Sequence, residues 1–521
     1  MGSKAKALAA WLMICCLALS SCSGSIPLNP EPVAVTLPPA QSSYVAPIGD
    51  AALEYTGEAT LFLPRADNAR LSAITQAVAY SAARPQAESV ARALLAHEGN
   101  SVLSSLGGSV KLSLYGANPV ELSRDVATVN LSASALQLDR KAFFLACQAI
   151  TNTLTSLPGI HYVNVLVMDR SLGLDIAGAL PMGSLSRSVG EDAGALYEQL
   201  LTQRVKTAED PASKGLTAPV TLYFPLSHLD GILPEVRSCS FESQAPSDMV
   251  ARLLEELAAG PQQVNRSPAL PQLASLLATP PEVTEAPEGG GRLITLRYGA
   301  GFDDMLTGLD LNRATVMASI CHTLATFLPG IGGVRFYIGQ DRVQNVLVRD
   351  SANQVAILFN EAVQYRADYS AFLMDISTLY FASQDGQKLL EVERPMPYYL
   401  TKNPRALVLE LAKGPQSFDS QPAFPLLSAG ALRDSDLVGF SLNDTTLLVN
   451  FAPTFSLVGQ GFSPQQDRLL AYGLVNTLSS ISRIRRVCFF VAGEWPKDFS
   501  GTIQWSGAFY KNTGLVRSPG R

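Results

Sequence analysis

Histidine is the side chain most often used for acid–base and metal chemistry near neutral pH, and this chain of 521 residues contains four histidines. They are His97, His161, His228 and His322, and they fall at unrelated points of the sequence. None stands in a zinc-binding spacing such as His-Glu-x-x-His, which places two imidazoles on one face of a helix. The sequence therefore predicts no metal site and no catalytic histidine.

The seven cysteines form no Cys-x-x-Cys pair. Cys147, Cys321 and Cys488 lie in apolar stretches, where a buried thiol usually packs as a small hydrophobic group. The glycine runs at 289–291 and 459–461 lack the Lys-Ser or Lys-Thr that a phosphate-binding loop needs. We therefore expect no disulfide framework and no bound cofactor.

Cys22 stands at the end of an export signal. Lys4 and Lys6 precede an apolar run over residues 7–19, and the tetrapeptide that ends at Cys22 reads Leu-Ser-Ser-Cys. As a helix the run spans roughly 20 Å, which is short of the ~30 Å hydrocarbon core of a bilayer. The tetrapeptide resembles the lipobox of bacterial lipoproteins, which implies cleavage before Cys22 and attachment of diacylglycerol to its thiol. The alternative is an ordinary cleaved signal with an incidental cysteine.

One phrase recurs three times, at 160–167, 331–338 and 484–491. Each copy has an Ile, a Val three residues later and apolar residues at every second position, which is the period of a strand with one face against a core. An apolar stripe with helical spacing precedes each copy. We therefore expect a helix that ends directly before a strand, three times over.

The rest of a unit precedes each phrase. An opening hairpin is predicted around 60–63, 221–224 and 378–381, because β-branched and aromatic residues favour strands. A helix and a second hairpin follow, and the helices of the second and third copies end at Gly260-Pro261 and Gly414-Pro415. Each unit is thus predicted to run β-β-α-β-β-α-β.

These signals predict an α+β fold of three tandem repeats, each with helices packed on a small mixed or antiparallel sheet. Units of this length can bury a core of their own. The segment from Trp495 to the last residue contains two tryptophans and is expected to add a last strand. The predicted divisions are a signal peptide at 1–22, a Pro- and Ser-rich tether at 23–50, units at 51–170, 220–340 and 377–495, ordered bridges at 171–219 and 341–376, and a tail at 496–521.

Some polar residues recur at matched positions of the units. Asn152-Thr153, His322-Thr323 and Asn476-Thr477 precede a Leu in the closing helices, and Asn130 matches Asn450 near the end of a strand. An Asn near a helix end more often bonds the backbone locally than acts in catalysis, and we expect exposed strand positions for Asn130 and Asn450. No acid, base or nucleophile recurs with the units. We therefore expect the protein not to be an enzyme.

The repeated unit resembles the GerM domain family. The resemblance rests on the Leu-Tyr-Phe strand, the Asp-Gly turn, the helix that ends in Gly-Pro, the Val-Asn strand and the ending Leu-Pro-Gly-Ile, although the first copy lacks both Gly-Pro and Asp-Gly. The family occurs in lipoproteins of endospore-forming bacteria that serve sporulation and germination, commonly as two copies. Its core is similar to ring-building folds that associate side by side.

The resemblance implies a non-enzymatic, lipid-anchored scaffold on the extracytoplasmic face of the cell membrane. Its expected partners are the membrane through the lipid, envelope or sporulation-complex proteins, peptidoglycan and further copies of itself. Nucleic acid is not expected, since the net charge is −6. Two alternatives stay open, namely a ligand-binding envelope lipoprotein for cell-wall glycan or peptide, and a cell-wall hydrolase with its site in a bridge.

Overall fold

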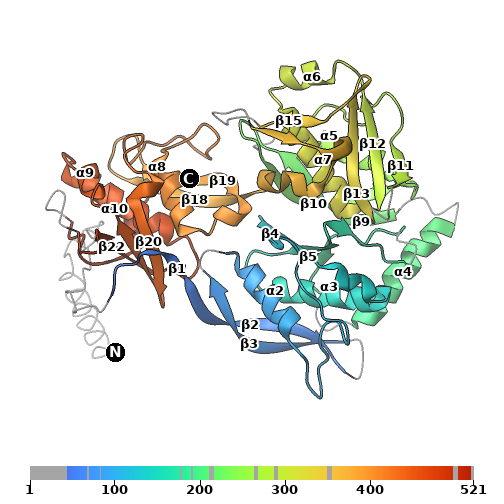
Figure 1. The fold of residues 1–521 in the computed structure, drawn as a ribbon, viewed down its shortest axis with the longest axis horizontal. Coiled ribbons are helices and arrows are strands. Elements are labelled where there is room, and N and C mark those ends of the chain that lie inside the picture. The colour runs from blue at the N-terminus through green and yellow to red at the C-terminus, as the bar shows by residue number, and fades with distance from the viewer. Residues whose placement is uncertain are drawn as a thin grey trace, which may run out of the picture.

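The computed structural model shows three lobes, each built from one of the repeated units (Figure 1). Within the described residues the same order of elements occurs in all three, which confirms the α+β class and the tandem repeat. The structure describes residues 44–66, 70–81, 84–175, 179–188, 192–209, 216–262, 268–286, 291–348, 355–496 and 503–517.

The first unit opens with a two-stranded antiparallel ribbon that forms no sheet with the later strands. Its second hairpin and its closing strand form a mixed sheet, because the closing strand β6 lies parallel to β5 after the crossover helix α3. The elements are β2 (Glu54–Pro64), β3 (Leu71–Ser81), α2 (Gln86–Ala96), β4 (Val120–Ser123), β5 (Val126–Leu131), α3 (Arg140–Leu154) and β6 (Tyr162–Val167).

The other two units repeat this plan. The second contains β9 (Leu216–Pro225), β10 (Ile232–Phe241), α5 (Pro246–Ala258), β11 (Glu282–Glu285), β12 (Arg292–Tyr298), α7 (Arg313–Phe327) and β13 (Ile331–Ile338). The third contains β18 (Met374–Ala382), β19 (Leu389–Pro397), α8 (Pro404–Ala412), β20 (Leu437–Asn443), β21 (Thr446–Phe451), α10 (Pro464–Leu478) and β22 (Arg486–Val491).

Short elements fill the bridges and extend the sheets. The predicted last strand of the tail is present, because β23 pairs antiparallel with β22. These elements are β7 (Arg170–Ser171), β8 (Leu185–Ser186), α4 (Ala193–Glu209), α6 (Phe302–Gly308), β14 (Asp341–Arg342), β15 (Asn345–Leu347), β16 (Ala356–Leu358), β17 (Val363–Gln364), α9 (Phe455–Val458) and β23 (Ala508–Tyr510), with short 3-10 turns between them.

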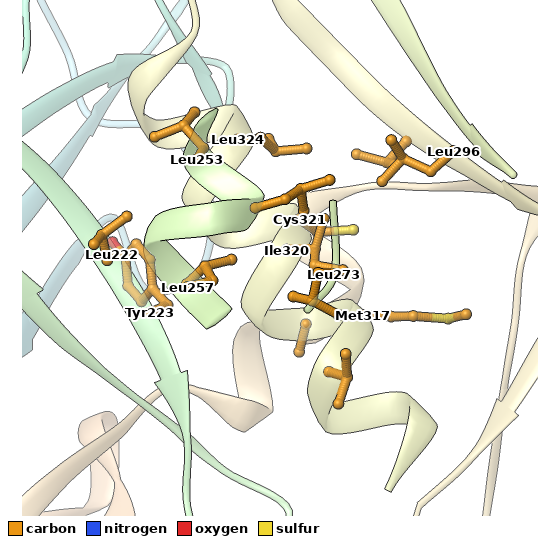
Figure 2. Packing of buried hydrophobic residues seen from close by; sticks show 14 of the residues in the cluster. Leu222, Tyr223, Leu253, Leu257, Leu273, Leu296, Met317, Ile320, Cys321 and Leu324 are labelled. Carbon is orange, nitrogen blue, oxygen red and sulfur yellow. The ribbon is translucent and has the colours of Figure 1, made fainter. Parts of the chain in front are cut away.

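Each unit buries its closing helix between the ribbon and the sheet. In the second unit the predicted apolar stripe of α7 is fully inside the core (Figure 2). It meets Leu222 and Tyr223 of the ribbon on one side and Leu296 of the sheet on the other. The stripe consists of Met317, Ile320, Leu324 and Leu328.

The second bridge belongs to the core of the second unit. Val346, Phe359, Tyr369 and Phe372 are buried in the same hydrophobic cluster as α7. The core of this unit therefore extends past residue 340, where the sequence pattern ended it. These residues could not be assigned to the second unit from the sequence, because the bridge does not repeat in the other units and so cannot be aligned with them.

The N-terminal segment differs from the expected tether. Residues 44–50 do not lead freely to the first unit, because β1 (Gly49–Ala52) pairs in parallel with β20 of the third unit. In Figure 1, β1 lies beside β20 in the lobe that ends the chain. The bare edge of β20 offers backbone groups that an extended segment can bond. Residues 23–43 and Cys22 lie outside the described residues.

Candidate functional site

The three matched threonines each bond the opening ribbon of their own unit. Thr153, Thr323 and Thr477 are fully buried on the closing helices. Their hydroxyl oxygens accept hydrogen bonds from the backbone N–H of Phe62 at 2.9 Å, Tyr223 at 3.1 Å and Tyr380 at 3.1 Å, respectively. The hydroxyl thus pairs a buried backbone donor that faces the helix and has no ladder partner there. The recurrence marks a fold contact.

The residue before each threonine holds the segment that follows the closing strand. Asn152 donates to the carbonyl of Ser188 at 2.7 Å and accepts from its N–H at 2.9 Å, and Asn476 makes the same pair of bonds with Asn512 at 3.1 and 2.8 Å. The partners are 36 residues away in both cases, so the expected local bonding is wrong. A primary amide fits this task because it matches a peptide group with one donor and one acceptor.

His322 takes the same position in the second unit. Its Nε2 lies 3.3 Å from the carbonyl of Tyr369, and the side chain is fully buried. Burial, reinforced by the positive charge of Arg366, holds the pKa of His322 well below its usual range. The imidazole is therefore neutral at physiological pH and lies in the core, away from solvent.

The other three histidines have separate surroundings. Nδ1 of His97 accepts a hydrogen bond from the N–H of Gly99 at 3.0 Å. His161 lies 3.6 Å from Asp125, and His228 lies 3.4 Å from Asp310, both with exposed rings. Each contact serves a turn, and none of them joins two histidines.

A recurring arginine binds the glycine that ends the first helix in the second and third units. Arg237 on β10 and Arg394 on β19 donate to the carbonyls of Gly260 at 2.9 Å and Gly414 at 2.7 Å. Each guanidinium also lies over a ribbon phenylalanine, at 5.5 Å from the ring centre of Phe224 and 5.3 Å from that of Phe381. These arginines bind the end of the first helix of the unit.

The first unit lacks this arrangement as a whole. Its corresponding strand position is Gln76, paired with Ala59, and its first helix ends without Gly-Pro. Arg187 of the first bridge lies 5.7 Å from the ring centre of Phe62, which matches Tyr223 and Tyr380 rather than Phe224 and Phe381. Sequence reasoning missed the arginine, although its joint presence with Gly-Pro in two copies and joint absence in the first was a usable signal.

Asn130 and Asn450 are likewise structural, but they are not the exposed positions expected. Asn450 is buried, with an exposed fraction of 3%, and Asn130 is half-buried. Their side-chain oxygens accept from the N–H of Asp169 at 3.0 Å and Gly493 at 3.1 Å, just after the closing strands. The amides hold the turn that ends each strand.

Thiol chemistry is disfavoured by burial. Cys147, Cys239, Cys321 and Cys488 are free and buried, as expected of small hydrophobic residues. Burial raises the pKa of all four thiols, to about 12 for Cys239 and Cys488. A thiol with so high a pKa supplies almost no thiolate nucleophile at neutral pH.

The first and second units meet at a buried ion pair. The guanidinium of Arg366, in the second bridge, forms two hydrogen bonds with the carboxylate of Glu121 on β4, one of 2.8 Å between Nη1 and Oε1. Nε of Arg366 also donates to Thr326 of α7 at 3.3 Å. The side chains are only 3% and 11% exposed. Two charges removed from water in this way require each other.

Further buried hydrogen bonds join the same two units. Asn164 of β6 donates to the hydroxyl of Thr221 on β9 at 2.9 Å, and the N–H of Gly330 donates to the carbonyl of Ser171 at 2.8 Å. The contact between the first and second units therefore involves the sheet of the first and the ribbon of the second. These positions are far from Glu121 and Arg366 in the sequence.

The third unit docks on the turn of the second hairpin of the first. Ser123 donates to the carbonyl of Met374, and the N–H of Arg124 donates to Asp375 at 2.8 Å. Burial raises the pKa of Asp375. Tyr55 of the first unit also packs against the third, with Arg483 lying 5.2 Å from its ring centre. The described units therefore form one interlocked body.

Neither a metal centre nor a membrane span was found in the part of the chain that the structure describes. No group of three His, Cys, Asp or Glu side chains there is placed to hold a metal ion. No helix among the described residues has the length and apolar character to cross a bilayer.

The comparisons with known proteins identify the repeated fold. Residues 60–173 and 378–496 match the family model described as "Germane: Sporulation and spore germination". The first and third units thus match the Germane family model, which confirms the resemblance for these two. The second unit shares their order of elements and their threonine contact. A search of curated proteins found no match.

Two solved structures are similar to this chain. One, described as the tandem GerMN domains of the sporulation protein GerM from Bacillus subtilis, is 16% identical with a TM-score of 0.21, and the match covers 60% of this chain and 99% of that one. The other, a putative lipoprotein from Clostridium perfringens, is 20% identical with a TM-score of 0.18, and the match covers 26% of this chain and 88% of that one.

Proposed function

We propose that this protein is a non-enzymatic scaffold of the bacterial envelope that acts in sporulation or spore germination. The observation that supports it most is the use of the recurring polar residues. The matched threonines, the Asn or His before them and the arginines all bond the backbone of the protein itself. Side chains committed in this way are not available to substrate. The two Germane segments supply the link to sporulation and germination.

The scaffold is held on the extracytoplasmic face of the cell membrane by lipid on Cys22. The Leu-Ser-Ser-Cys tetrapeptide after an apolar run supports this part of the proposal. Two acyl chains on one residue give firm attachment. Cells that express a Cys22→Ala chain should show no labelled palmitate on the protein and should accumulate uncleaved precursor. Equal labelling of the two chains would contradict the anchor.

Its partners are envelope or sporulation-complex proteins, with peptidoglycan and further copies of the chain as additional candidates. A surface that suits a protein partner lies on the hairpin of β15 and β16. Leu347, Val355 and Leu358 there are 53%, 51% and 76% exposed. Apolar side chains gathered on one short hairpin are typical of a contact that a partner covers.

The test compares two surfaces of the full-length protein in sporulating cells. The hairpin variant is Leu347→Ser with Leu358→Ser, and the control is Leu457→Ser on α9, whose side chain is 62% exposed. We expect chemical crosslinking to recover fewer membrane proteins with the hairpin variant and unchanged recovery with the control. The scaffold proposal fails if a chain without crosslinked partners still supports wild-type sporulation and germination.

A further inference from the structure

The edge strand of the third sheet differs from those of the other two. In the described residues, β4 and β11 end their sheets, whereas β20 is followed by β1 from the N-terminal segment. Pro119 precedes β4, and Pro280 and Pro281 precede β11. Proline has no N–H to give to an added strand. The third unit has Gly439 at the position that faces Asn450, where the first has Pro119 facing Asn130.

Gly439 leaves room for the added segment. A Cβ built on it would lie 2.6 Å from both the N and the O of Gly49 and 2.9 Å from the O of Pro47. Its φ lies outside the left-handed region, so the backbone there does not itself demand glycine. The absent side chain is therefore explained by the close approach of residues 47–49.

Two polar side chains of the third unit hold residues 44–52. One binds the backbone of this segment, and the other binds its only acidic residue, Asp50. Asn450 donates through Nδ2 to the carbonyl of Pro47 at 2.9 Å, whereas the matching Asn130 donates to Asp169 of its own unit. Arg405 makes two hydrogen bonds to the carboxylate of Asp50, at 2.6 and 2.9 Å. A bidentate pair of this kind fixes position as well as charge.

Side chains on one side of the segment face the sheet. Tyr44 and Ala46 pack against the buried cluster of Leu448, Cys488 and Phe490, and Pro47 is buried. Val45 and Ile48 point to solvent, with exposed fractions of 81% and 88%. The segment before β1 therefore has one side packed on the sheet and one side in solvent.

We propose that the β20 edge is a strand-binding site whose occupant is residues 44–52 of the same chain, which thereby clasp the first and third units together. The occupant is argued from the clearance at Gly439, the amide of Asn450 and the charge match between Arg405 and Asp50. The site is independent of lipid attachment, so its test does not depend on Cys22.

The test is an engineered disulfide between positions 52 and 441, because Ala52 and Ser441 lie opposite each other on the paired strands. Neighbouring strands lie about 4.8 Å apart, a spacing that a disulfide can span. The full-length chain with Ala52→Cys and Ser441→Cys should oxidise to a monomer with increased mobility on a non-reducing gel. Each single variant should show no shift, which excludes disulfides to native cysteines.

Charge reversal on the segment then separates docking from folding. Adding Asp50→Lys, which leaves the sequence of the third unit unchanged, should slow disulfide formation by about tenfold, the effect of losing one charge-assisted contact. Glu54→Lys, the same change at an exposed position of β2, should leave the rate unchanged. Gly439→Val should prevent the disulfide, since its side chain fills the space of Gly49.

Three results would overturn the inference. No disulfide in a normally folded chain would show that the edge is unoccupied. A disulfide-linked dimer would assign the site to the segment of a second copy. Equal rates for Asp50→Lys and Glu54→Lys would remove the role of Arg405. If Gly439→Val fails to fold, the comparison of the two lysine variants still decides the question.

Discussion

Thr323 is the residue whose hydroxyl joins the ribbon of the second unit to its central helix. Thr323→Val keeps the shape but leaves the N–H of Tyr223 buried without its acceptor. We expect a loss of about 1–3 kcal/mol in the free energy of unfolding, the cost of an unpaired buried donor. Denaturant titration measures it, and hydrogen exchange at the Tyr223 amide localises it. Thr323→Ser, which keeps the acceptor, should preserve the protection of that amide.

His322 should make the protein sensitive to mild acid. Because burial keeps its folded pKa well below the ordinary 6.5, the unfolded chain binds a proton below that pH and the folded chain does not. Above pH 6.5 His322 therefore does not lower the free energy of unfolding. Below that pH the free energy of unfolding falls, by up to about 1.4 kcal/mol per pH unit.

The matched control for this prediction is His322→Asn, the residue found at the same place in the other two units. The pH slope of unfolding midpoints between pH 5 and 6.5, above the range of ordinary carboxylates, should be smaller in this variant. Equal slopes in the two chains would show that another group titrates.

At this scale the sequence identified matched positions but not their tasks. Asn152, His322 and Asn476 were found because they stand before the recurring threonine. Their partners follow the closing strands, in segments with no sequence similarity, so only the folded chain brings them together. The repeated polar positions predicted that these residues are important in each unit. Their hydrogen-bond partners are set by tertiary contacts that the sequence does not show.

At the scale of elements, the second bridge is the part whose removal should be most damaging. A fragment of residues 219–340 follows the sequence pattern of the second unit but lacks the buried Phe359, Tyr369 and Phe372. Each buried aromatic residue contributes about 3–5 kcal/mol, and the stability of a domain is only about 5–15 kcal/mol. We expect this fragment to unfold without a cooperative transition.

A fragment of residues 216–373 restores those aromatic side chains and the whole of β9. It should melt cooperatively by circular dichroism and resist proteolysis better than the shorter fragment. Cooperative melting of the 219–340 fragment at the same temperature would contradict the role of the bridge.

Periodic apolar residues predicted the helices and strands well. The stripes of α3, α7 and α10 and the alternation in β6, β13 and β22 follow from which side chains must be buried. The separation of the opening ribbon from the main sheet was not predictable, because a strand pattern shows which face is buried and not which strand lies beside it. For the same reason the sequence could not predict that β1 pairs with β20, which begins at Leu437.

At the scale of the whole molecule, the ion pair of Glu121 and Arg366 should couple the units. Glu121→Gln keeps the shape but leaves the guanidinium buried without its counter-charge. We expect a loss of about 3–5 kcal/mol in the free energy of unfolding. The matched control is Glu198→Gln, which breaks an exposed pair with Lys141 and should cost less than about 1 kcal/mol.

Chemical denaturation of the full-length chain measures both variants. If the units are coupled as described, Glu121→Gln should lower the midpoint of a transition shared by probes in the first and second units. Separate midpoints for the two units in the wild-type chain, or equal effects of the two substitutions, would contradict this coupling.

The pairing of β1 with β20 also sets the order in which the protein can be completed. The N–H of Phe440 donates to Asp50 at 3.2 Å across 390 residues of sequence. Closing so long a loop in an unfolded chain costs roughly 5 kcal/mol of entropy, and that cost falls once the intervening units are folded and docked. Because synthesis runs from the N-terminus, residues 44–52 are made long before their binding edge on β20. These residues can therefore pair with β20 only after the third unit has been made.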